Sequence, residues 1–147
     1  MLNFRPSIAS DLPRVMDIWR AAVDATHDFL DPGDRDAIEA ELLEFFPQVS
    51  LLLAVNSSDA PLGFMFLHDG HLEALFVAPD HHGKGIGKAL IRNVLAAHPN
   101  LTVDVNEQNP KALGFYEHLD FERIGRSAQD GQGRPYPLIH LRRRADS

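Results

Sequence analysis

A glycine-rich segment between an apolar run and a helical pattern most constrains how this chain can fold. Residues 77–90 read VAPDHHGKGIGKAL. The Pro-Asp pair predicts a turn, and Gly83, Gly85 and Gly87 form a backbone that a ligand can approach closely. The residues that follow have helical spacing, so N–H groups at the start of the helix would face an anion. The segment therefore predicts a phosphate-binding loop, and the alternative is a plain turn from a strand to a helix.

Two common phosphate-binding loops do not fit this spacing. A nucleotide-hydrolase P-loop has four residues between its glycines, and the hydroxyl residue after its lysine binds Mg²⁺. Here three residues separate Gly83 from Gly87, and Ala89 follows Lys88. The dinucleotide-binding pattern G-x-G-x-x-G is incomplete from either start, because Lys88 or Leu90 stands where its third glycine belongs. The remaining interpretation is a loop whose backbone amides hold a pyrophosphate.

The composition and charge of the chain exclude several classes of protein. Of its 147 residues, 44% are hydrophobic and 24% are charged, as in an ordinary globular protein. We expect one domain over residues 1–147. Without a membrane-length apolar run, a secretion signal or any cysteine, we expect a cytoplasmic location. A net charge of −7 argues against nucleic acid as a partner. The histidines lack the ligand spacing of a zinc site, so no metal is expected.

Hydrophobic periodicity predicts strands and helices that alternate along the chain. Helical spacing marks four segments, at 12–23, 33–46, 87–98 and 109–119. Short apolar runs bounded by turn residues predict seven strands, at 2–6, 51–55, 62–68, 71–77, 101–105, 121–127 and 136–143. Asp69-Gly70 is a two-residue hairpin signal, so the middle strands should form an antiparallel meander. The order β-α-α-β-β-β-α-β-α-β-β predicts a mixed α/β fold, with a mainly antiparallel sheet flanked by helices.

Two motifs resemble the signatures of the GNAT superfamily of N-acetyltransferases. Residues 75–91, LFVAPDHHGKGIGKALI, are similar to its acetyl-CoA motif, a strand followed by R/Q-x-x-G-x-G/A and a helix. Residues 109–121, NPKALGFYEHLDF, are similar to its second signature, N-x-x-A-x-x-F-Y-x-x-x-G-F. The chain departs from the signatures at His82, where Arg or Gln is usual, and at Asp120, which replaces a glycine. Within the superfamily, DATHDFL, VNEQN and GRPYPL look closest to the YjaB group of small bacterial members.

This resemblance implies the GNAT fold and a particular reaction. The enzyme would move an acetyl group from acetyl-CoA, its co-substrate, to a primary amine of a small molecule or a protein, by direct transfer in a ternary complex. Backbone groups of Leu75, Phe76 and Val77 would pair with the pantetheine arm. The loop would hold the pyrophosphate through His82, Gly83, Lys84, Gly85, Ile86, Gly87 and Lys88. Asn109 matches a further cofactor contact, or it is simply the cap of the following helix.

The resemblance also implies catalytic residues. Tyr116 stands at the position of the general acid, where its phenol would protonate the departing CoA sulfur; the alternative is a core aromatic. An amine like that of lysine, with a pKa of about 10.4, must lose a proton before it attacks, so a base helps. Glu73, on the strand before the loop, is our first choice, and Asp104, His27 or a water relay are the alternatives. Tyr136 would face the acceptor pocket, and the alternative is an aromatic side chain buried in the core.

The region expected to bind the acceptor is acidic. In the family the acceptor is held by the first two helices and the last hairpin, and here the loop between those helices and its flanks contain Asp24, Asp28, Asp31 and Asp34. These charges would suit a cationic amine, although aspartate is also common in caps and loops. No nucleic-acid or membrane partner is expected, and a homodimer is left open. The alternative function is a module that binds or senses acyl-CoA without turnover.

Overall fold

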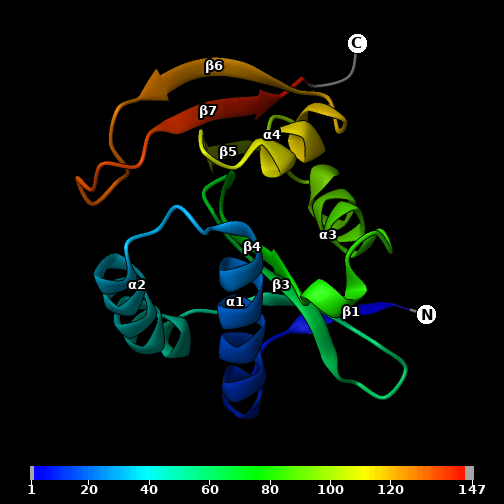
Figure 1. Ribbon diagram of the computed structural model, residues 1–147. Helices are drawn as coiled ribbons and strands as arrows, with labels where there is room; N and C mark the ends of the chain where they lie inside the picture. Colours follow the sequence, from blue (N-terminus) through cyan, green and yellow to red (C-terminus); the bar gives the residue numbers. More distant parts are fainter. Residues whose placement is uncertain (1, 145–147) are drawn as a thin grey trace. The chain divides into compact units, whose positions relative to one another are not determined.

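The computed structural model describes residues 2–144, and its helices and strands follow the predicted order (Figure 1). The strands are β1 (Asn3–Pro6), β2 (Leu52–Val55), β3 (Pro61–His68), β4 (His71–Val77), β5 (Thr102–Asn106), β6 (Phe121–Ser127) and β7 (Leu138–Arg143). The helices are α1 (Leu12–Thr26), α2 (Pro32–Phe45), α3 (Ile86–Leu95) and α4 (Pro110–Glu117). Short 3-10 turns lie at Ala9–Asp11, Phe46–Gln48 and Pro79–His81.

The described strands form a seven-stranded sheet with the hydrogen-bonded order β1-β2-β3-β4-β5-β7-β6. The pairs β1–β2, β2–β3, β5–β7 and β6–β7 are antiparallel, and β4–β5 is parallel. Between β3 and β4, Asp69 and Gly70 have φ of +50° and +76°, as a two-residue type I′ hairpin turn requires. The predicted mixed α/β fold, with a mainly antiparallel sheet and flanking helices, is confirmed.

Several element boundaries differ from the prediction by one to three residues, and two of these differences have a clear physical reason. The prediction extends α3 to His98, but the helix ends at Leu95, the last apolar residue before two exposed alanines. Without burial, nothing offsets the entropy of a further turn, and the proline after His98 disfavours a helical conformation there. The last strand begins at Leu138 instead of residue 136, because Pro137 has no N–H group to donate to a ladder.

The described chain divides into two compact units. The loop unit contains the residues up to Phe66 together with Ala74–Leu90. The hairpin unit contains Leu67–Glu73 and the described residues from Ile91 onward. The glycine loop thus belongs to the loop unit, whereas β5, α4, β6 and β7 belong to the hairpin unit. Among the helices of the described residues, none is both long enough and apolar enough to cross a membrane.

The core of the loop unit forms because α1 has one apolar face. Val15, Ile18 and Trp19 recur at helical spacing and are at most 2% exposed. They belong to one buried cluster with Leu53 of β2 and Phe64 of β3, neither of which is exposed at all. Burying each such side chain contributes roughly 1.5–3 kcal/mol, so this helix face holds β2 and β3 in place.

The sheet of the hairpin unit has one apolar and one polar face. Val103 and Val105 of β5 and Ile139 and Leu141 of β7 are buried, and α4 contacts β5 and β6 (Figure 1). The residues between them point the other way, because strand side chains alternate. Asp104, which pairs with a histidine of β7, therefore lies on the polar face.

The start of the chain is held by a buried carboxylate. Two nitrogens of Arg5 lie 2.9 Å from the two oxygens of Asp11, and the N–H group of Ile8 donates to the same carboxylate at 2.8 Å. Asp11 is only 7% exposed. The Arg5 guanidinium holds the pKa of Asp11 below its ordinary value, because its hydrogen bonds favour the charged form.

We expect Asp11→Asn to lower the free energy of unfolding by about 2 kcal/mol, since charge-assisted hydrogen bonds are lost. The matched control is Asp59→Asn: Asp59 also binds Arg5, at 2.7 Å, but its side chain is 69% exposed, so the loss should stay below about 1 kcal/mol.

The pKa of Asp11 is lowered on folding. Its contribution is therefore complete above the unfolded-state pKa of about 3.9 and is lost as the pH falls through the folded-state pKa. Urea denaturation at neutral and acid pH measures both effects; equal losses in the two variants, or a gap that persists in acid, would contradict this assignment.

Candidate active site

The glycine loop follows β4 in a conformation that needs glycine at two positions. Gly83 and Gly85 have φ of +78° and +77°, in the left-handed region that other residues avoid. A Cβ atom added at either glycine would meet nothing within 4 Å. The backbone conformation, and not a lack of space, therefore accounts for these glycines.

The amides of this loop are available to a ligand. The first backbone bond of α3 is donated by Ala89 to the carbonyl of Gly85, at 2.9 Å. Within the described part of the chain, the N–H groups of residues 83–88 donate to no backbone acceptor. The N–H group of His82 is engaged, because it donates to the carbonyl of Pro79 at 3.1 Å, but the His82 side chain is exposed. A run of unpartnered amides at the start of a helix fits an anionic pyrophosphate.

The end of β4 is brought close to β3 by a glycine that the sequence analysis did not single out. A Cβ atom at Gly63 would lie 3.0 Å from the carbonyl oxygen of Phe76 and 3.2 Å from the side chain of Ile86. The Phe76 ring also packs on Phe64, at 5.6 Å between ring centres. Leu75, Phe76 and Val77 are partly buried. A glycine inside a strand often marks such a close backbone approach, and this signal was present in the sequence.

Tyr116 is packed in the core, as the alternative to a catalytic role predicted. It is 7% exposed, and its ring packs edge-on against Phe115 at 5.0 Å and Phe121 at 5.3 Å. Burial raises the pKa of Tyr116 well above its ordinary value, because a phenolate would lose its hydration. Within the described residues its hydroxyl has no hydrogen-bond partner. The side chain is therefore a core aromatic that keeps its proton, and its role as a general acid stays a prediction.

Asn109 caps α4. It is 9% exposed, and its side-chain oxygen accepts a hydrogen bond from the N–H group of Ala112 at 3.2 Å. The structure therefore contains the helix cap that was the alternative to a cofactor contact. A role for Asn109 in cofactor binding stays a prediction.

The expected catalytic residues lie in the hairpin unit, whereas the glycine loop belongs to the loop unit. Glu73 is exposed and follows the buried Leu72, so it lies on the polar face with His71. Tyr136 is 7% exposed, just before β7. Asp104, the alternative base, contacts the imidazole rings of His71 and His140. No sequence motif pointed to these two histidines, because their spacing along the chain follows no known ligand pattern.

His27, the third candidate base, belongs to the loop unit. Its Nδ1 lies 2.6 Å from the hydroxyl oxygen of Thr26, and its ring packs against Phe29. Burial lowers the pKa of His27, because it disfavours the imidazolium. The neutral ring is thus available to accept a proton, although its nearest partner is a hydroxyl of its own helix.

The acidic loop between α1 and α2 is partly neutralised. Asp24 binds Arg35 through bonds of 2.7 and 3.2 Å, and Asp31 caps α2 by accepting from the N–H group of Gly33 at 3.0 Å. At these two positions the aspartates serve helix structure, as their residue type commonly does.

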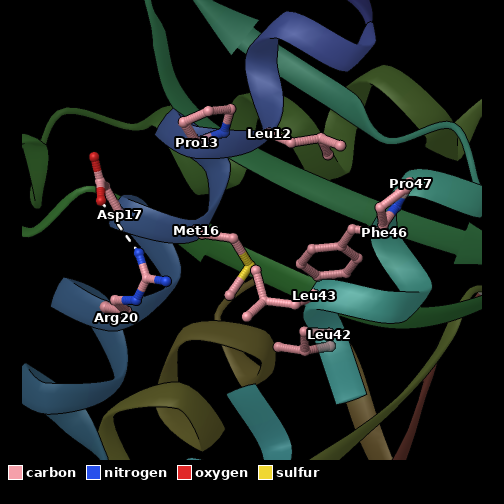
Figure 2. A pocket seen from close by; sticks show the side chains of 9 residues that line it. All are labelled: Leu12, Pro13, Met16, Asp17, Arg20, Leu42, Leu43, Phe46 and Pro47. Atoms are coloured by element: carbon pink, nitrogen blue, oxygen red, sulfur yellow. Dashed lines mark hydrogen bonds and ion pairs between the residues drawn. The ribbon is translucent and has the colours of Figure 1, made fainter. Parts of the chain in front are cut away.

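A pocket of about 340 Å³ lies between α1 and α2, within the loop unit (Figure 2). Its lining is mostly hydrocarbon, with an Asp17–Arg20 contact of 3.3 Å at one side. The lining residues are Leu12, Pro13, Met16, Asp17, Arg20, Leu42, Leu43, Phe46 and Pro47. None of the expected site residues is among them, and an apolar lining does not suit a pyrophosphate. We therefore take the loop amides, and not this pocket, as the candidate cofactor site.

Known proteins with a related sequence define the family. The profile described as "Acetyltransferase (GNAT) domain" matches residues 19–135. Peptidyl-lysine N-acetyltransferase YjaB of Salmonella typhimurium is 45% identical over 141 residues, which are 96% of this chain and 97% of that protein. The chain therefore belongs to the GNAT family and is an N-acetyltransferase. The expected family and its YjaB-like character are confirmed.

Solved structures agree with this assignment. The solution structure of apo-form YjaB from Escherichia coli matches with a TM-score of 0.94 and 41% identity, over 99% of both chains. The PaiA N-acetyltransferase from Thermoplasma acidophilum, solved in complex with coenzyme A, matches with a TM-score of 0.78 over 98% of this chain and 99% of that chain. At 16% identity, the latter supports the fold alone.

Proposed function

We propose that this N-acetyltransferase transfers the acetyl group of acetyl-CoA to the ε-amine of lysine in a peptide or protein, directly and in a ternary complex. The unpartnered amides of residues 83–88 carry the proposal for the donor, because they offer a pyrophosphate several N–H groups at a helix start. The name of the YjaB relatives, peptidyl-lysine N-acetyltransferase, supports the choice of acceptor.

On the donor side, backbone groups would do most of the binding. The N–H groups of residues 83–88 would hold the pyrophosphate, with the exposed His82 and Lys84 side chains beside them. The backbone of Leu75, Phe76 and Val77 would pair with the pantetheine arm as a further strand does. Acetyl-CoA supplies an activated thioester. A backbone N–H group on β4 would stabilise the negative charge that develops on its carbonyl oxygen.

Two proton movements complete the reaction. The acceptor ammonium must lose a proton before its nitrogen can attack, and the departing thiolate must gain one. Tyr116 would supply the second proton, since burial keeps its phenol protonated. Glu73 stays a candidate for the base, beside Asp104, His27 or a water relay, and Tyr136 stays a candidate for a contact with the acceptor. We further propose that the chain acts as one domain, without a metal and in the cytoplasm.

Acetylation of defined peptides tests the function. The purified protein is incubated with acetyl-CoA and three amines: a peptide with one lysine and a blocked N-terminus, a lysine-free peptide with a free N-terminus, and a polyamine. We expect thiol release and addition of one acetyl group with the lysine peptide, and none when arginine replaces lysine. Turnover with the polyamine or the free N-terminus alone would reject the acceptor. Coenzyme A binding without turnover of any amine would instead favour the sensing module.

A further inference from the structure

A chain of hydrogen bonds, extended by one charge contact of a histidine, crosses the polar face of the hairpin unit. The Oγ of Ser127 lies 2.6 Å from Nε2 of His140, and Nδ1 of His140 lies 2.6 Å from Oδ1 of Asp104. On the other side, Nε2 of His71 lies 3.4 Å from Oδ2 of Asp104, and its Nδ1 lies 2.7 Å from the hydroxyl of Thr102. A hydroxyl, an imidazole and a carboxylate therefore stand in line, and both ring nitrogens of His140 are engaged.

The partners of His140 decide which of its nitrogens is basic. A carboxylate only accepts hydrogen bonds, so Nδ1 of His140 carries a proton and donates it to Asp104. In the neutral ring, Nε2 then has a free lone pair, which accepts the hydrogen bond of the Ser127 hydroxyl. The Ser-His-Asp triad of hydrolases has the same three side-chain types in the same order, and its histidine accepts the proton of the serine hydroxyl.

A β-bulge in β6 brings Ser127 to this face. The pairing of β6 with β7 shifts between Arg123 and Gly125, and after the shift Gly125 opposes His140. Ser127 then opposes Leu138, two residues before His140 and on the same face. Without the extra residue, Ser127 would lie on the apolar face, because side chains alternate along a strand. A Cβ atom at Gly125 would lie 3.4 Å from Cδ2 of His140, so the glycine also leaves room for the ring.

The network is accessible and lies in an acidic setting. The side chains of Asp104, His140 and His71 are 36%, 30% and 28% exposed. The other charged groups that the strands place on this face are Glu73 of β4, Glu122 of β6 and Arg142 of β7, and the guanidinium of Arg144 lies 4.0 Å from the Glu122 carboxylate. The three carboxylates, Asp104, Glu73 and Glu122, outnumber the two guanidinium groups, which favours the approach of an ammonium group. Within residues 2–144, no three His, Cys, Asp or Glu side chains are arranged to hold a metal ion.

We propose that Ser127 and His140 form the relay that removes the proton from the acceptor ammonium, with Asp104 positioning His140. This inference rests on the proposed function. The ammonium gives one proton to Oγ of Ser127 as the Ser127 hydroxyl proton passes to Nε2 of His140. The products are a neutral amine, an unchanged serine and an imidazolium paired with the Asp104 carboxylate. His71, fixed by Thr102, holds the second oxygen of Asp104 and is a positioning residue.

The first test is His140→Asn, assayed by kcat/KM for the lysine peptide at saturating acetyl-CoA. Asparagine keeps an N–H donor for Asp104 but has no basic nitrogen. We expect a loss of about 100-fold near pH 7, a typical value for a positioned base. Between about pH 7 and 9 the variant should recover nearly tenfold per pH unit, because only neutral lysine, with a pKa of about 10.4, then reacts. The unchanged protein should show a much shallower rise.

A second variant and a control separate the relay from a structural network. Ser127→Ala removes one hydroxyl and should lose roughly tenfold near pH 7, with the same steeper pH dependence. The control is His118→Asn, an exposed histidine after α4 in the same unit, which should keep the rate and pH profile of the unchanged protein. Circular dichroism establishes that each variant is folded, and if His140→Asn is not, Ser127→Ala decides.

The outcomes distinguish the two proposals. If the unchanged protein acetylates no lysine peptide, the proposed function fails and the relay fails with it. If the unchanged protein is active and both variants keep its rate and shallow pH dependence, the relay is wrong while the proposed function stands. A loss of rate that is the same at every pH means that the network is only structural, and this result also overturns the relay.

Discussion

Tyr116→Phe lowers kcat for lysine-peptide acetylation by about 100-fold near pH 7, while the protein stays folded. The change removes only the hydroxyl, and the ring keeps its packing against Phe115 and Phe121. A general acid contributes about 10²–10⁴-fold, and the lower end applies because water can protonate a thiolate slowly. The measurement is steady-state thiol release at saturating acetyl-CoA and peptide, together with thermal unfolding of both proteins.

The pH dependence sharpens this test. Burial raises the pKa of Tyr116, so its phenol stays protonated through the pH range in which an ordinary tyrosine, with a pKa of about 10, ionises. In the unchanged protein, kcat should therefore not fall as the pH approaches 10 through ionisation of Tyr116. A fall that is present in the unchanged protein and absent in Tyr116→Phe would report such an ionisation. Such a fall would mean that the phenol is not buried, and full activity of the variant at every pH would mean that Tyr116 is not the acid.

Gly85→Ala weakens coenzyme A binding by about tenfold. Gly85 has a φ of +77°, and an alanine there favours another conformation in the free loop, so coenzyme A binding must restore the left-handed one at roughly 1–2 kcal/mol, which is close to a factor of ten in affinity. No atom lies within 4 Å of the added Cβ, so the effect comes from the backbone alone. Isothermal titration calorimetry with coenzyme A measures it.

Gly131→Ala is the matched control for the loop variant. An added Cβ at Gly131 also meets nothing within 4 Å, but Gly131 does not have a left-handed φ. We expect its coenzyme A affinity to equal that of the unchanged protein. Equal affinity of both variants would show that the conformation at Gly85 does not matter for the cofactor, and the assignment of the pyrophosphate to this loop would then need revision.

Much of the fold could be predicted because its signals are local. The Asp69-Gly70 turn, the helical spacing of α1 and the alternation along β4 each depend on residues that are neighbours in the chain. The ends of elements were harder: α3 stops before His98 because burial, which is a tertiary property, is missing there. The close approach of β3 and β4 at Gly63 was also missed, although a glycine inside a strand is a signal of such contacts.

The sequence by itself determined the order of the elements, the glycine loop before α3 and the position of Tyr116 in its motif, because each depends on short-range spacing. Only the tertiary structure decided that Asp104, Ser127 and His140 meet. These residues come from three strands, and their contact requires both the register of β5 with β7 and the bulge in β6. A shift of one residue in that pairing would turn Ser127 to the other face, and no local pattern specifies long-range register at that precision.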